Sequence, residues 1–371
     1  MRELLSELRD WHTAGTPFAL ATVVAVRGSA PRAPGAVMAV SATGAVAGSV
    51  SGGCVESDVY EVAGEALSTG RTLLRTYGIS DDEAFGIGLT CGGTIEVVVR
   101  PYVEEGDRVA LRELVDTVAA GEPVALATVV SGAAPAGAHR TVLAGRAAGS
   151  LGDQGLDAAV TDDARGLLAQ GVTGTTRYGA HGERRMQDVT VFVQTYAPAP
   201  RMLVFGAIDH AAATARIGSF LGYRVTVCDA RPVFATRERF PTADEVVCAW
   251  PHTYLESTPV DARTVICVLT HDPKFDVPLL AAALRTPAAY IGAMGSRRTH
   301  ADRTARLREA GVGEAELARL ASPVGLDLGA RTPEETAVSI AAEIVQHRWG
   351  GTGRPLGELA GAIHHAREPG T

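Results

Sequence analysis

The first part of the chain carries one pattern twice. Residues 17–24, PFALATVV, recur at 123–130 as PVALATVV. Three further pairs of segments echo one another in the same order: 48–50 and 149–151, 74–78 and 175–179, and 95–102 and 189–196. A segment repeated in this way is one supersecondary unit present in two copies. The sequence therefore predicts an N-terminal domain over residues 1–198, built from a duplicated α/β unit with repeats of about 1–104 and 105–198.

After residue 198 the pattern becomes that of a nucleotide-binding fold. A strand at 201–205 and a tight turn at Gly206-Ala207 precede a helix at 209–221 and a second strand that ends at Asp229. A βαβ unit of about 30 residues, with an acid about 20 residues past the glycine, is typical of dinucleotide-binding sheets. Further strands are predicted at 245–247, 264–269 and 288–291. We therefore expect a C-terminal Rossmann-like, doubly wound parallel sheet over residues 199–371, and an α/β fold class for the whole chain.

The glycine pattern of this turn departs from the usual G-x-G-x-x-G, because the chain has Gly206, Ile208 and Ala211 at the three positions. The middle glycine lets the backbone approach a pyrophosphate, and Ile208 places a branched side chain there. One alternative nevertheless remains open. The protein would then be an NAD(P)-dependent oxidoreductase that uses Gly206 and Asp229 for the cofactor and His271 or Cys54 in catalysis.

A cysteine lies where the first repeat passes from strand to helix. The run Gly48–Glu56, GSVSGGCVE, precedes a predicted helix at 55–69, so Gly52, Gly53 and Cys54 lie near a helix N-terminus. Backbone N–H groups converge there, and they favour an anion and a thiolate. Cys91 also adjoins paired glycines, in Thr90–Gly93. Our hypothesis is that these residues form one site that handles anions and metal, with Cys54 as the metal contact.

Two other interpretations of the cysteines remain open. Cys54 could be a small buried residue in a tight turn, or Cys54 and Cys91 could form the reversible disulfide of a redox sensor. The second repeat favours a functional role, because it has Asp153–Asp157 (DQGLD) in place of the cysteine turn and no cysteine at 182–188. Residues that only fill a core would be needed in both copies.

Polar residues also follow two strands of the predicted parallel sheet. His271 comes after the strand at 264–269 and is a candidate general base or metal ligand, although a lone histidine near a loop is more often neither. Gly295 and Ser296 form a predicted turn and N-cap, and Arg297 and Arg298 add positive charge to that helix N-terminus. The segment predicts a phosphate-binding position, with solvated arginines as the alternative.

Composition restricts the class of protein. The net charge is −8 without a basic block, which argues against nucleic-acid binding. The 5 cysteines contain no CxxC pair and suit a reducing compartment. No apolar run reaches membrane-spanning length, and the N-terminus lacks the apolar core of a signal peptide. We expect a cytoplasmic protein, without a membrane or nucleic-acid partner, that forms a homodimer.

Four motifs in order resemble those of the xanthine dehydrogenase accessory proteins, the XdhC/CoxI family: Gly48–Glu56, Thr90–Gly93, Tyr290–Arg298 and Pro323–Glu335. The resemblance covers nearly the whole chain. It implies an accessory factor, not an enzyme, that binds molybdenum cofactor (molybdopterin) and delivers it in sulfurated form to xanthine dehydrogenase or a related molybdenum hydroxylase. It also implies that Cys54 contacts the cofactor, and it admits a cysteine desulfurase as a further partner. A thiolate suits such a soft metal–sulfur centre, and a helix N-terminus suits the phosphate.

Overall fold

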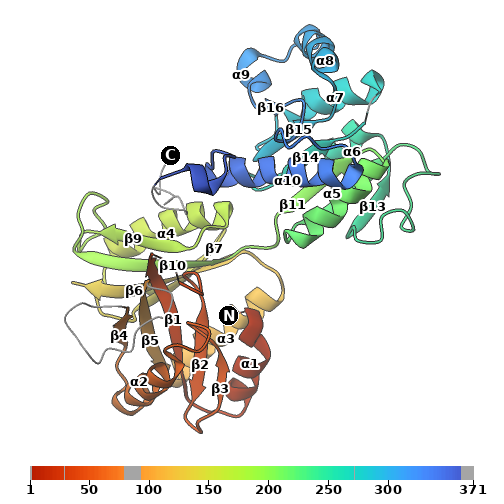
Figure 1. The fold of residues 1–371 in the computed structure, drawn as a ribbon. Coiled ribbons are helices and arrows are strands. Elements are labelled where there is room, and N and C mark those ends of the chain that lie inside the picture. The colour runs from red at the N-terminus through yellow and green to blue at the C-terminus, as the bar shows by residue number, and fades with distance from the viewer. Residues whose placement is uncertain (1, 29, 79–92, 271, 361–371) are drawn as a thin grey trace. The chain divides into compact units, whose positions relative to one another are not determined.

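The computed structural model describes residues 2–28, 30–78, 93–270 and 272–360 (Figure 1). The chain divides into two compact units between Pro198 and Ala199, and each unit is described by itself. Among the described residues, no helix is both long enough and apolar enough to cross a membrane.

Unit 1 contains two five-stranded antiparallel sheets with the same strand order, β3-β2-β1-β5-β4 and β8-β7-β6-β10-β9. The first repeat consists of η1 (Arg2–Leu4), α1 (Leu5–Thr13), β1 (Phe18–Arg27), β2 (Val37–Ser41), β3 (Val46–Gly48), α2 (Glu56–Thr69), β4 (Leu73–Tyr77) and β5 (Thr94–Tyr102). The second consists of α3 (Glu105–Ala119), β6 (Val124–Gly132), β7 (His139–Leu143), β8 (Ala147–Ser150), α4 (Gln154–Gln170), β9 (Gly174–Tyr178) and β10 (Val189–Tyr196). The identical order is the duplication that the sequence predicts.

Alternation along the central strands explains how each sheet packs. In β1, Ala21 and Val23 face the core under α2, whereas Phe18 and Leu20 face the core that α1 and α3 share. Successive side chains of a strand point to opposite faces, so one apolar strand can serve two cores. A small cluster that includes Val24 and Phe192 joins the two repeats.

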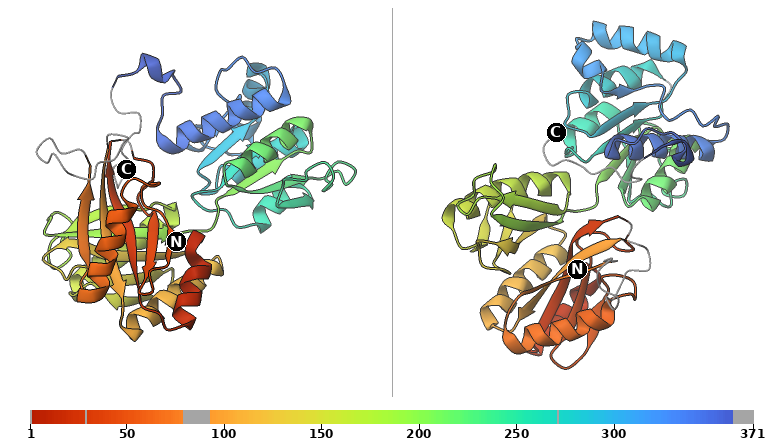
Figure 2. Two further views of the ribbon diagram at one scale, coloured as in Figure 1. Left: turned by 60° about the horizontal axis from the view of Figure 1, so that its bottom comes forward. Right: turned by 60° about the vertical axis from the view of Figure 1, so that its left-hand side comes forward.

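Unit 2 is a six-stranded parallel sheet in the order β13-β12-β11-β14-β15-β16. Its elements are β11 (Arg201–Phe205), α5 (Asp209–Phe220), β12 (Arg224–Asp229), β13 (Glu245–Cys248), α6 (Pro251–Ser257), β14 (Val265–Val268), α7 (Pro273–Ala283), β15 (Tyr290–Ala293), α8 (Arg297–Glu309), α9 (Glu314–Leu317), β16 (Leu320–Ala321), α10 (Pro333–Trp349) and η2 (Leu356–Glu358). Numbered from the first strand of the unit, this is 3-2-1-4-5-6, the arrangement of dinucleotide-binding folds. Helices cover both faces of the sheet (Figure 2), which confirms the Rossmann-type prediction.

Candidate functional site

The cysteine turn joins β3 to α2. Gly52 and Gly53 have φ angles of +78° and +119°, a region that residues with a Cβ rarely adopt. No atom lies within 4 Å of a Cβ built at either position, so glycine is required here for backbone conformation and not for space. Cys54 is half-buried at the edge of the core under α2, and its N–H donates to Ser51 Oγ at 2.9 Å.

The carboxylate of Glu56 fills this turn. It accepts hydrogen bonds from the backbone N–H groups of Val50, Ser51, Gly52, Gly53 and Val55, at 2.8–3.2 Å, and from the hydroxyls of Ser49 and Ser51. Burial raises the pKa of this carboxyl, but the hydrogen bonds from the two serines and the backbone outweigh burial and lower the pKa to about 2. The anion that these donors hold is thus part of the chain, whereas the sequence led us to expect an external one.

The equivalent turn of the second repeat is built differently. Asp153 is an ordinary N-cap of α4 and accepts the N–H groups of Gly155 and Leu156 at 2.8 and 3.0 Å. Asp157, at the position of Glu56, accepts the Leu151 N–H at 2.7 Å. The difference between the copies therefore extends beyond the missing thiol to the whole hydrogen-bond pattern of the turn.

In the turn after β11, the carboxylate of Asp229 is hydrogen-bonded to the backbone of the turn itself. Gly206 has φ +111°, and a Cβ there would lie 3.1 Å from the backbone carbon of Leu269. Asp229 is 3% exposed and accepts the Ala207 N–H at 2.7 Å. Arg231 gives it three more hydrogen bonds at 2.8–2.9 Å, from the backbone N–H and the guanidinium. A ribose hydroxyl would have to displace one of these four donors.

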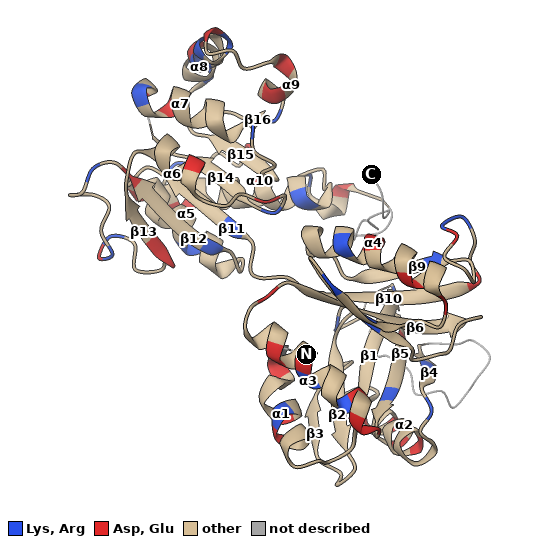
Figure 3. Cartoon of the chain, turned by 180° about the vertical axis from the view of Figure 1, so that it is seen from behind, with Lys and Arg blue, Asp and Glu red and all other residues tan. Residues whose placement is uncertain are grey.

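The predicted helix start at Ser296 is confirmed, because Ser296 Oγ accepts the Thr299 N–H at 3.1 Å and caps α8. Arg297 and Arg298 are exposed in the first turn of α8, the arginine-rich helix of Figure 3. Neither arginine is hydrogen-bonded or ion-paired with a described residue. Both guanidinium groups are thus available to an anion.

Sequence reasoning missed a buried ion pair at the carboxyl edge of this sheet. Arg303 of α8 and Asp276 of α7 are 4% and 3% exposed, and Arg303 Nη2 donates to Asp276 Oδ2 at 2.8 Å. The same nitrogen donates to Met294 O, and the Thr270 hydroxyl donates to Asp276. Because Nη1 also donates to Ser322 Oγ at 3.3 Å, the pair connects the segments after β14, β15 and β16.

Two predicted residues, Cys91 and His271, lie outside the described part of the chain. Their proximity to Cys54 or to Asp229 thus stays a prediction. Within the described ranges, no three His, Cys, Asp or Glu side chains are grouped so that they could hold a metal ion.

Two α/β units, the second with the strand order of a Rossmann domain, define the class of protein. The model of the XdhC Rossmann domain matches residues 202–344, and the model of the XdhC and CoxI family matches residues 11–78 and 117–179. The chain belongs to the XdhC and CoxI family.

Relatives match both units. A protein of Bacillus subtilis (strain 168) that is named as a probable xanthine dehydrogenase component is 32% identical over 334 residues, which cover 89% of this chain and 92% of the relative. The molybdenum cofactor insertion chaperone PaoD of Escherichia coli (strain K12) is 26% identical over 335 residues, covering 90% of this chain and 85% of PaoD. A crystal structure described as a xanthine dehydrogenase from Bacillus halodurans, 26% identical, aligns with 92% of this chain and 95% of its own with a TM-score of 0.61.

Proposed function

We propose that this protein is an accessory factor that binds molybdenum cofactor and delivers it, in sulfurated form, to xanthine dehydrogenase or a related molybdenum hydroxylase. The observation that carries the proposal is the alignment of nine-tenths of the chain, through both units, with a protein named as a molybdenum cofactor insertion chaperone. For sulfuration we propose a cysteine desulfurase as the sulfur donor, and for the assembly a cytoplasmic homodimer.

Cys54 is the residue that we propose contacts the cofactor. The residue is half-buried, and the hydrogen bonds to Glu56 fix the backbone of the turn on both sides of it. A cysteine thiolate is the protein ligand best matched to a soft metal–sulfur centre. Since Glu56 already engages the N–H groups of the turn, we do not place the cofactor's phosphate there. Within unit 2, we propose the exposed Arg297 and Arg298, beside Gly295 and Ser296 at the start of α8, as a phosphate-binding position of its own.

The same geometry speaks against the oxidoreductase alternative. A dinucleotide needs a free carboxylate for the ribose and a close approach to the glycine turn. Asp229 is fully hydrogen-bonded within the chain, and Ile208 occupies the position of the middle glycine. The redox-sensor alternative depends on Cys91, and thiol counting before and after mild peroxide tests it.

The proposal is tested by purifying the protein anaerobically from a molybdenum-replete host and measuring molybdenum and pterin per chain. We expect the wild type to retain cofactor and Cys54→Ala to lose it. The matched control is Cys248→Ala, which removes an exposed cysteine of unit 2 and should leave the content unchanged. Thermal unfolding verifies that each variant folds. A wild type without cofactor contradicts the function, and equal content in wild type and Cys54→Ala contradicts the role of the thiol.

Delivery needs a second measurement. The loaded protein is mixed with a cofactor-free molybdenum hydroxylase, and the hydroxylase activity that appears is followed with and without prior treatment with a cysteine desulfurase and cysteine. We expect hydroxylase activity only when the loaded protein has first been treated with the cysteine desulfurase and cysteine. If the hydroxylase becomes active without this treatment, the cofactor is not sulfurated on this protein by the desulfurase, and that part of the proposal is wrong.

A further inference from the structure

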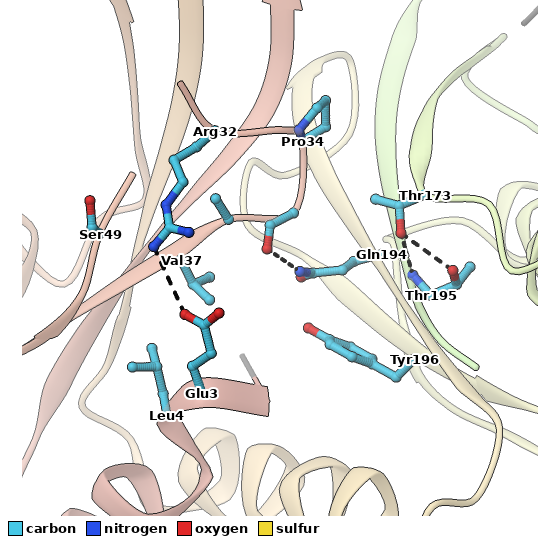
Figure 4. A pocket seen from close by; sticks show the side chains of 12 residues that line it. Glu3, Leu4, Arg32, Pro34, Val37, Ser49, Thr173, Gln194, Thr195 and Tyr196 are labelled. Atoms are coloured by element: carbon cyan, nitrogen blue, oxygen red, sulfur yellow. Dashed lines mark hydrogen bonds and ion pairs between the residues drawn. The ribbon is translucent and has the colours of Figure 1, made fainter. Parts of the chain in front are cut away.

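Unit 1 contains a cavity of about 300 Å³ between its two repeats (Figure 4). The first repeat contributes Arg32, Gly35 and Ser49 to its wall, and the second contributes Thr173, Gln194 and Tyr196. This volume lies at the lower end of the range for small-molecule sites, which is enough for a bicyclic ring system.

Gln194 contributes a side-chain amide to the wall of this cavity. The residue is 6% exposed, and its Nε2 donates to the carbonyl oxygen of Gly35 at 2.7 Å. Because that carbonyl can only accept, the amide nitrogen must face it, and Oε1 is left as the other end of the amide. None of the described residues donates a hydrogen bond to this Oε1. An amide oxygen in a cavity wall that no described residue engages can accept a hydrogen bond from a ligand that brings an N–H group.

A positive charge lies in the opposite wall. The Arg32 guanidinium is 3.9 Å from Glu3 Oε2, and the two side chains are 40% and 78% exposed. An ion pair this exposed contributes little, so the guanidinium can exchange Glu3 for an anionic group of a ligand. The cavity wall thus combines an amide acceptor with a cation that solvent reaches.

The second repeat provides an internal comparison. Arg100 pairs with Leu20 in the first repeat as Gln194 pairs with Leu126 in the second, so the two residues occupy equivalent positions. Arg100 is held by Asp107 at 2.9 Å. In the second repeat, His139 occupies the position that Val37 has in the first. The cavity that His139 lines measures only about 70 Å³. The larger cavity is therefore not a general consequence of the fold.

The cavity also adjoins the cysteine turn. Ser49 lines the cavity, and its hydroxyl donates to Glu56 Oε1 at 2.5 Å inside that turn. One serine thus belongs to both features.

We propose that this cavity binds the ring of a pterin, with the N–H edge of its 2-amino-4-oxopyrimidine facing Gln194 Oε1 and an anionic substituent at Arg32. The assignment rests on the proposed function and names the part of the molecule that unit 1 holds. Guanine carries the same edge, so a guanine nucleotide is the competing source of this chemistry.

The test is a fluorescence titration of the full-length protein, prepared free of cofactor, with pterin-6-carboxylate, unsubstituted pterin and guanosine monophosphate. We expect saturable binding of both pterins. Gln194→Met should weaken both by about tenfold or more, since it removes the acceptor proposed for the N–H edge of the ring. Arg32→Gln changes an exposed residue and should weaken only pterin-6-carboxylate, by about tenfold. The matched control is Thr141→Ala, in the wall of the smaller cavity, which should change neither affinity.

Each outcome separates this proposal from the function on which it rests. If the wild type retains molybdenum and pterin in the cell but binds neither free pterin, or if Arg32→Gln and Gln194→Met bind both as the wild type does, the cavity assignment is wrong and the proposed function stands. Guanosine monophosphate binding more tightly than the pterins overturns the assignment to a pterin. If Gln194→Met does not fold, Arg32→Gln alone tests the assignment: weaker binding of pterin-6-carboxylate with unchanged binding of pterin supports it, and unchanged binding of both contradicts it.

Discussion

The backbone N–H of Gly53 donates to the carboxylate of Glu56 at 2.8 Å, which closes the turn that carries Cys54 from within. The same carboxylate accepts the N–H of Val55 on the other side of the cysteine. The thiol is thus attached to a segment whose backbone is hydrogen-bonded before any ligand arrives. A preorganised backbone lowers the ordering cost of binding.

We predict that Glu56→Gln lowers the free energy of unfolding at pH 7 by about 2–3 kcal/mol, because an amide NH₂ would face backbone donors that now meet a carboxylate. Urea unfolding measures the change. The matched control is Asp157→Asn at the equivalent position of the second repeat, where fewer donors meet the carboxylate, with an expected loss of about 1 kcal/mol. Equal losses in the two variants would contradict the special role of Glu56.

Acid should destabilise the turn in a defined range of pH. The pKa of Glu56 is lowered from 4.5 to about 2 in the folded protein. A lowered carboxyl pKa stabilises the fold above the unfolded value, and this stabilisation is lost as the pH falls from about 4.5 to about 2. Glu56→Gln has no carboxyl to protonate, so its unfolding free energy should vary less over this range in urea titrations at stepped pH. Parallel curves for the two proteins would refute the assignment.

His139 should make the free energy of unfolding depend on pH in a higher range than Glu56 does. Its burial is the main reason that its pKa is lowered from 6.5 to about 4, and the positive charge of Arg100 adds to this, while Asp107 opposes it. The unfolded chain therefore binds a proton below about pH 6.5 that the folded chain refuses until about pH 4, and stability falls as the pH decreases between these values. We expect a loss on the order of 1–3 kcal/mol. His139→Asn should remove this part of the pH dependence. A wild-type stability that is flat from pH 6.5 to 4 would contradict it.

The buried pair of Asp276 and Arg303 should behave as a unit. Removing either partner leaves an uncompensated buried charge, so Asp276→Ala and Arg303→Ala should each cost about 3–5 kcal/mol. The double variant Asp276→Ala with Arg303→Ala should cost less than the sum, because both charges are then gone. Denaturant unfolding of the four proteins gives the coupling energy. Additive losses would show that the two side chains act independently.

The sequence predicts the fold better than it predicts the ends of its strands. The repeat of 17–24 at 123–130 and the βαβ pattern at 201–229 each depend on local order, and both correspond to observed elements. The strand expected at 288–291 lies at Tyr290–Ala293 instead. Ala288 and Ala289 carry the same apolar signal as the strand, and the pairing of Tyr290 with Val265 in the neighbouring strand selects the register.

For the candidate site, local signals succeeded and distant ones failed. Ser296 was recognisable as an N-cap because a cap is defined within four residues. The hydrogen bonds from the turn to Glu56 could not be recognised in the sequence, since an acid in the first turn of a helix is ordinary. Only the three-dimensional turn brings seven donors to its carboxylate. Asp276 and Arg303 lie 27 positions apart on different helices, a separation that no spacing rule covers.

Arg297 and Arg298 should affect binding without affecting stability. Both are exposed and make no ion pair with a described residue, so Arg297→Ala with Arg298→Ala should change the unfolding free energy by less than about 0.5 kcal/mol. Charge-assisted hydrogen bonds contribute about 1.5–3 kcal/mol each, so the same variant should weaken binding of a phosphate-bearing cofactor by a few kcal/mol at most. Cofactor retention at stepped salt concentration measures this. The control is Arg306→Ala, which removes an exposed arginine from the last turn of α8 and should leave retention unchanged. An equal loss in the control would mean that the whole charge of the helix, and not its N-terminus, attracts the cofactor.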